Sequence, residues 1–242
     1  SSSDNNIAVK YITGVNNNAR SDIYWFEDKI IDHSRVLIYF TLSDLTSKYN
    51  IYEKVIKPIN KIGFNWISLK LNYYFANIWF NKNGLIDKKL ISIKNNVKKT
   101  LKENQCDKLE TWFLKEIELL IYQTSYWRNF FLDHKVKIHF DLEEFSLIPN
   151  IKSIACDILE IIYLGNERST IPKLDYFFFG YYPYDVFFSW SKRSAENYLI
   201  TNNSKRNVLI SGFPYNKALT YSIKKGKQLY LQYFGRKKFF TI

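Results

Sequence analysis

Acidic side chains crowd into the segment HFDLEEF, directly after an apolar run. His139, Asp141, Glu143 and Glu144 lie within six residues, and residues 136–140 before them alternate as a strand does. A carboxylate at the end of a strand can act as a general base toward a hydroxyl nucleophile, or can orient a sugar. We predict Asp141 or Glu144 as this base. The simpler alternative is a solvated acidic loop before a helix, with His139 a structural histidine.

The segment GNERST offers a second polar loop. It contains Glu167, Arg168 and Ser169, and we predict that all three bind substrate, because an arginine fork suits a phosphate or carboxylate group. The alternative is a surface loop with one exposed ion pair, which adds little stability.

The segment FFSWSKRS places Trp190, Ser191 and Lys192 after a predicted strand. Ser194 is positioned to cap the next helix. Free amides at that helix start, together with two cations, predict binding of a diphosphate or another anion. The alternative is an ordinary serine cap beside solvated cations.

Two further segments predict substrate contacts. In SGFP, Gly212 permits close approach to the backbone at a strand end. In YFFFGYYPY, the density of aromatic residues suggests a stacking platform for sugar rings or lipid headgroups, and Tyr182 is the contact we select from it. Core packing is the alternative for this segment, since aromatic side chains dominate buried area.

Strand and helix patterns alternate along the chain, and the elements that they predict must position these side chains. Apolar runs at residues 35–40 and 64–69 and the stretch RNVLISGFP (206–214) predict buried strands, and a helix between the first two ends near Gly63. Residues 107–135 form the longest helical pattern, and a further helix runs from Pro149 to Gly165. This order predicts an α/β fold, Rossmann-like, with a mostly parallel sheet flanked by helices, which binds ligands at the carboxyl ends of its strands.

The length of the chain allows one large domain or two small ones. The chain has 242 residues, of which 46% are hydrophobic. We divide it into a polar N-terminal segment (1–20), a Rossmann-like domain (21–216) and a linker or start of a second domain (217–242). Cys106 and Cys156 lack metal-ligand spacing and are expected to be reduced, buried thiols. No metal site is expected, and no apolar run is long enough to cross a bilayer.

The net charge of +12 is compatible with an anionic partner, either nucleic acid or a membrane surface. The chain is also rich in Lys, Asn, Ile, Tyr and Phe, which AT-rich codons encode, so part of the lysine excess is expected on solvated faces. It contains no methionine.

Three segments resemble one family. DVFFSWSKRSAENYL with VLISGFPYN looks like the end of the amino-terminal domain of GT-B glycosyltransferases, most similar to bacterial surface-polysaccharide biosynthesis enzymes. DIYWFEDKIIDHSRVLIYF resembles the opening of that group. GNERST lies where the group often has a Gln-Arg-Ser-like loop, with Glu167 in place of the glutamine.

The resemblance implies the acceptor-side half of a cytoplasmic, peripherally membrane-associated glycosyltransferase. Such an enzyme transfers sugar from a nucleotide-sugar donor to a lipid-linked or glycan acceptor and needs no other cofactor. Its basic, aromatic surface would suit an anionic membrane. The alternative is a non-catalytic basic domain for nucleic-acid binding or interaction, which rests on charge and aromatic content alone.

Overall fold

The structure is a computed structural model, which describes residues 6–10, 31–41, 52–69, 88–103, 107–142, 148–167, 183–201 and 207–212. Its centre is a seven-stranded sheet with the order β3-β2-β1-β4-β5-β6-β7, in which every described pairing is parallel. The strands are β1 (Ile7–Lys10), β2 (Val36–Thr41), β3 (Asn65–Leu69), β4 (Ile138–Asp141), β5 (Ile162–Asn166), β6 (Val186–Ser189) and β7 (Asn207–Ile210). This confirms the predicted α/β, Rossmann-like fold, because the order reverses between β1 and β4 as in a doubly wound sheet.

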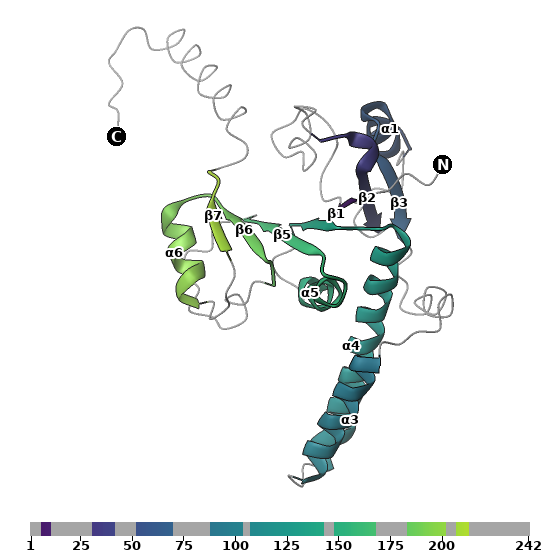
Figure 1. The fold of residues 1–242 in the computed structure, drawn as a ribbon, viewed down its shortest axis with the longest axis vertical. Coiled ribbons are helices and arrows are strands. Elements are labelled where there is room, and N and C mark those ends of the chain that lie inside the picture. The colour runs from purple at the N-terminus through teal and green to yellow at the C-terminus, as the bar shows by residue number, and fades with distance from the viewer. Residues whose placement is uncertain are drawn as a thin grey trace, which may run out of the picture.

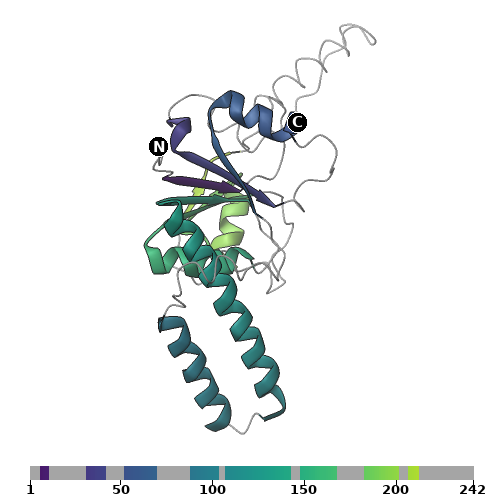
Figure 2. The ribbon, with the colours of Figure 1, turned by 90° about the vertical axis from the view of Figure 1, so that its right-hand side faces the viewer.

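Helices cover both faces of the sheet (Figures 1 and 2). On one face lies α1 (Lys57–Ile62), which follows a short π-helix, η4 (Tyr52–Ile56). The other face is covered by α4 (Asp107–Asp133), α5 (Ile148–Leu159) and α6 (Lys192–Thr201). Helix α3 (Lys88–Glu103) packs on the first half of α4, away from the sheet.

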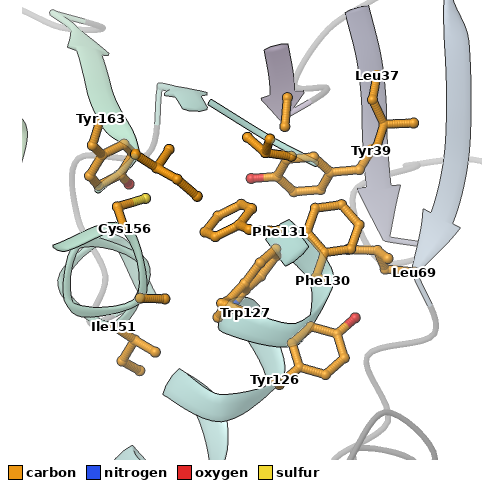
Figure 3. Close-up of a cluster of buried hydrophobic side chains, with 14 of the residues drawn as sticks. Leu37, Tyr39, Leu69, Tyr126, Trp127, Phe130, Phe131, Ile151, Cys156 and Tyr163 are labelled. Atoms are coloured by element: carbon orange, nitrogen blue, oxygen red, sulfur yellow. The ribbon is translucent and has the colours of Figure 1, made fainter. Parts of the chain in front are cut away.

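Each face has its own core. The face under α4 and α5 is aromatic, and Figure 3 shows Trp127, Phe130 and Phe131 pointing from α4 toward Tyr39 of β2 and Tyr163 of β5. The opposite face is built from smaller aliphatic residues with Phe40 and Phe140. Aromatic side chains contribute large buried areas, and edge-on ring pairs add further stability, so α4 and α5 are anchored to the centre of the sheet.

The clearest sequence patterns predicted their elements correctly. The run at residues 35–40 covers β2 except for its last residue, Thr41, and the run at 64–69 contains β3. Helix α1 ends at Ile62, and Gly63 follows with φ of 92°, a left-handed conformation that glycine adopts without strain. Helix α5 begins at Ile148, beside the predicted Pro149 start.

Other expectations are corrected. The predicted helix up to Gly165 ends at Leu159, and Gly165 lies inside β5. A Cβ at Gly165 would come within 2.4 Å of the Tyr184 ring, so the glycine serves close packing and not helix termination. Strand β1, at the centre of the sheet, lies in the stretch 1–20 that was predicted as a polar segment.

Two apolar surfaces are less buried than expected. Strand β7 is at the sheet edge, with Leu209 48% and Ile210 57% exposed. On α4, several large apolar side chains are open to solvent, and Trp112 is 58% exposed. Cys156 is free and buried, and burial raises the pKa of its thiol; Cys106 lies outside the described residues. No helix in the described ranges is long and apolar enough to span a membrane.

Candidate functional site

Polar side chains collect where the central parallel strands end. Strand β4 ends at Asp141, and β5 and β6 end at Asn166 and Ser189. These ends share one edge of the sheet, since Asp141 pairs with Gly165 and Asn166 with Phe188. The carboxyl edge beside the reversal of strand order is where open α/β sheets bind ligands. Two buried carboxylates, Asp141 and Glu167, organise this edge.

Asp141 forms an ion pair inside the protein. Its Oδ2 atom lies 2.5 Å from Nζ of Lys152 on α5, and both side chains are almost completely buried. The Tyr163 hydroxyl also donates to Oδ2, over 3.3 Å. The lysine ammonium is positioned over the rings of Trp127, at 4.6 Å, and Tyr39, at 5.4 Å. Burial of two charges is costly, and the direct pairing and the ring faces offset that cost.

His139 continues this network. Its Nε2 atom is 2.7 Å from the Tyr39 hydroxyl, and its ring stacks on Tyr163 at 4.8 Å. Burial holds the pKa of His139 well below its usual value, and the charges of Lys152 and Lys10 lower it further. Burial also raises the pKa of Tyr163 well above 10.0. The histidine is therefore neutral and structural, as its alternation with apolar neighbours suggested.

Glu167 is buried in a different way. Its Oε2 atom accepts hydrogen bonds from the Ser189 hydroxyl, at 2.9 Å, and from the Trp190 amide, at 2.6 Å. Its Oε1 atom accepts from the Ser194 hydroxyl, at 2.7 Å. No cation is among these partners. The carboxylate is stabilised by neutral donors and by the positive end of α6, whose first turn it contacts.

The start of α6 adds exposed polar groups to this cluster. Ser191 Oγ accepts from the Ser194 amide, at 3.1 Å, so Ser191 is the N-cap. Our expectation that Ser194 caps the helix was therefore wrong, because its hydroxyl is bonded to Glu167. Ser191, Lys192 and Arg193 are exposed at the surface. We define the Glu167 cluster as Glu167, Ser189, Trp190, Ser191 and Ser194.

The structure brings several predicted residues together. Glu167, Trp190 and Ser191 share one cluster, although 22 residues separate Glu167 from Ser189. Lys192 lies beside them and is exposed, and its Nζ atom is 3.8 Å from Oε1 of Glu196. Gly212 follows β7 with φ of 76° and open space around it. The predicted residues Glu144, Arg168, Ser169 and Tyr182 lie outside the described residues.

Lys152 and Ser189 were not anticipated, and Ser194 was predicted only as a helix cap and not as a partner of Glu167. The signal for Lys152 is weak but present: it shares a helix face with Pro149 and Cys156, which are both buried, and a lysine at such a position requires a partner. Ser189 and Ser194 carry no comparable signal, because serine is ordinary at a strand end and in a first helical turn. Among the residues that the structure describes, no group of His, Cys, Asp or Glu forms a metal site.

Comparison of the chain with models of protein families, with curated proteins and with solved structures gave no match in any of the three.

Proposed function

We propose that this chain is the acceptor-binding half of a GT-B-type glycosyltransferase that acts in surface-polysaccharide assembly. The Rossmann-like fold supports this proposal, because it provides a strand edge at which a sugar can be held. The three segments that resemble surface-polysaccharide enzymes supply the more specific part. The reaction joins an acceptor hydroxyl oxygen to the anomeric carbon of the donor sugar, breaks the bond to the nucleoside diphosphate, and passes the hydroxyl proton to a base.

The Glu167 cluster is the observation that carries the proposal. Glu167 holds the strand end at Ser189 and the first turn of α6 in one fixed arrangement through three hydrogen bonds. Ser191 and the cations Lys192 and Arg193 are exposed next to it. A rigid, hydrogen-bonded edge with hydroxyl groups and long cationic side chains can position a polar ligand with little loss of entropy on binding.

The arrangement favours a sugar over a diphosphate at this position. The Trp190 and Ser194 amides, which an anion would use, already donate to Glu167 and to Ser191. The buried negative charge of Glu167 also repels a second anion nearby. Hydroxyl groups of a glycan acceptor are neutral and can both donate and accept. We therefore assign the exposed rim of the Glu167 cluster to the acceptor and leave the nucleotide-sugar donor to another part of the enzyme.

Of the two carboxylates that we predicted as the base, Glu144 is the better choice. Asp141 is fully buried and paired with Lys152, so a substrate hydroxyl does not reach it in this arrangement. Glu144 lies two residues beyond Leu142, the last described residue at this end of β4. A positioned general base contributes a factor of about 10² to 10⁴ to such a reaction.

The test is a transfer assay with the full-length protein, a panel of nucleotide sugars and glycan or lipid-linked acceptors. Glu144→Gln should lower kcat by about 10² or more, because it removes the base but keeps the side-chain size. Glu143→Gln is the matched control and should retain activity. Equal activity of both variants and the wild type would remove the base assignment.

The acceptor site needs its own variant. Ser191→Ala together with Lys192→Ala should raise KM for the acceptor several-fold and leave KM for the nucleotide sugar unchanged. If the protein transfers no sugar but binds single-stranded nucleic acid with a steep salt dependence, the alternative of a basic binding domain is correct and the glycosyltransferase proposal fails.

A further inference from the structure

Asn166, the last residue of β5, has a buried side chain with one polar atom left without a partner. The residue is 3% exposed. Its Nδ2 atom donates to the main-chain carbonyl of Glu167, over 2.9 Å, whereas its Oδ1 atom accepts no hydrogen bond from any residue that the structure describes. Most buried polar atoms in folded proteins are hydrogen-bonded, because an unpaired one lowers the stability of the fold. The Oδ1 atom of Asn166 therefore requires an explanation.

The amide of Asn166 lies on the opposite face of the sheet from the Glu167 cluster. Side chains alternate along a strand, and Tyr163 packs in the core under α4 and α5, so Leu164 and Asn166 belong to the other face. The cross-strand partner of Asn166 is Phe188, which packs with Leu164 against the core of that face. The hydrogen bond from Nδ2 to the carbonyl of the next residue directs the amide toward the carboxyl edge of the sheet.

The neighbours of Asn166 on this face are apolar. Phe188 is beside it on β6. Leu142 is one residue beyond the pair of Asp141 and Gly165, so it is the neighbour on the β4 side. Both side chains belong to the core of this face and carry no hydrogen-bond donor. Helix α1, which lies on the same face, packs against β3 at the far end of the sheet. These elements therefore offer no donor to Oδ1.

We propose that Asn166 determines specificity in the acceptor site, where its Oδ1 atom accepts a hydrogen bond from a hydroxyl or an acetamido N–H group of the acceptor sugar. This inference rests on the proposed function. Ligands of open α/β sheets bind beyond the carboxyl ends of the strands, and Asn166 and Glu167 are consecutive residues at that edge, so one ligand can contact both. An amide oxygen only accepts hydrogen bonds, and a cation among apolar neighbours is costly to bury. The ligand group is therefore a neutral donor.

A buried acceptor of this kind selects between ligands that differ in one group. A sugar that carries the donor satisfies Oδ1, whereas an analogue without it leaves the oxygen unpaired after water is excluded from the site. We expect a discrimination of about tenfold, because one hydrogen bond between neutral groups is involved. An ordered water could also satisfy Oδ1, so the experiment has to separate a ligand from a water that belongs to the fold.

The first measurement is the thermal stability of the full-length protein without ligand. Asn166→Leu keeps the branching of the side chain and removes the unpaired oxygen together with the bond to the Glu167 carbonyl, so the unfolding midpoint should stay the same or rise. Asn129→Leu is the matched control. Asn129 on α4 is 2% exposed, and its Oδ1 atom accepts from Arg128 at 3.4 Å. Loss of this bonded amide should lower the midpoint by about 2–4 °C.

The second measurement is the transfer assay with methyl glycosides of glucose, galactose and N-acetylglucosamine as acceptor probes. For the best probe, each non-reacting hydroxyl or acetamido group is replaced in turn by hydrogen. One of these derivatives should have a KM about tenfold above that of its parent in the wild type. In Asn166→Leu the parent should show the same rise and the derivative no further one, because both changes remove the same hydrogen bond.

Two further readouts separate a ligand contact from a structural defect. KM for the nucleotide sugar and kcat should stay close to the wild-type values in Asn166→Leu, since the substitution removes a contact to the acceptor alone. Asn166→Asp keeps an oxygen acceptor at the same atom and should hold the KM of the probe within about threefold of the wild type. Circular dichroism shows whether each variant folds.

Two results would overturn the inference and leave the glycosyltransferase proposal standing. One is a loss of thermal stability in Asn166→Leu as large as in Asn129→Leu, which would show that a fixed donor, such as an ordered water, satisfies Oδ1 in the fold. The other is an active enzyme in which Asn166→Leu changes no acceptor KM. If the wild-type protein transfers sugar to no acceptor, the proposed function itself fails, and this inference fails with it.

Discussion

The two buried carboxylates at the sheet edge, Asp141 and Glu167, differ in how their charge is stabilised. Asp141 is paired with a cation, Lys152, inside an aromatic core under α4 and α5. Glu167 has three neutral donors and lies at the start of a helix, beside exposed residues. The Asp141–Lys152 pair is buried among aromatic rings and therefore contributes to the stability of the fold. The Glu167 carboxylate is bound by neutral donors close to solvent, so it also fixes the positions of surface residues. This difference is why we place ligand binding near Glu167.

The largest expected effect comes from breaking the Asp141–Lys152 pair. Lys152→Met removes the lysine cation from the buried Asp141 carboxylate and should lower the free energy of unfolding by about 3–5 kcal/mol. Denaturant titration measures this change.

The double variant Asp141→Leu/Lys152→Met is the control for that experiment. It removes both charges and should recover most of the lost stability, since replacing a buried pair by apolar groups is often nearly neutral. If the single and double variants are equally unstable, the pair is not the main interaction of these two side chains.

A smaller effect is expected at Glu167. Glu167→Gln keeps the size of the side chain but replaces one carboxylate oxygen with an NH₂ group. The hydrogen bonds from the Ser189 hydroxyl and the Trp190 amide are then made to a neutral amide oxygen and are weaker, and the Ser194 hydroxyl must turn to accept from the NH₂ group. The free energy of unfolding should fall by about 1–3 kcal/mol.

The hydrogen bond between Glu167 and Ser194 can be tested by combining substitutions at both residues. Ser194→Ala in the Glu167→Gln background should cost less than Ser194→Ala alone, because the two side chains share one hydrogen bond. Strictly additive losses would show that the Glu167 cluster does not act as a unit.

The smallest effect is the pH dependence from His139. The folded protein keeps this side chain neutral, because its pKa lies well below 6.5, while in the unfolded chain it takes up a proton as the pH falls through 6.5. The unfolded state then binds more protons, so the free energy of unfolding decreases as the pH falls below 6.5, by up to about 1.4 kcal/mol per pH unit.

His139→Phe should flatten this slope between pH 6.5 and pH 5, as measured by denaturant titration at several pH values. A residual slope of the same sign is expected from His134, whose pKa burial also lowers. An unchanged slope in His139→Phe would mean that the histidine is not held neutral in the folded protein.

Sequence patterns predicted the elements whose signals are local. The run that forms β2 is apolar at five of its six positions, and Gly63 ends α1 through its own backbone conformation. Strand β1 has four residues after the polar start SSSDNN, which is the minimum length for a periodic signal. Strand β5 contains Gly165, and a glycine that follows a helical pattern is typical of a helix end. The structure shows instead that a side chain at this position would clash with the Tyr184 ring.

The sequence by itself determined that this chain builds an α/β fold and that acidic and serine-rich segments follow its strands. Only the tertiary structure decided which of these side chains meet. Lys152 reaches Asp141 because α5 packs across the end of β4, and Glu167 reaches Ser189 and Ser194 because β5 and β6 are neighbours in register. A side chain's type and its place along the chain are local properties, whereas its partner depends on how elements distant in sequence are packed together.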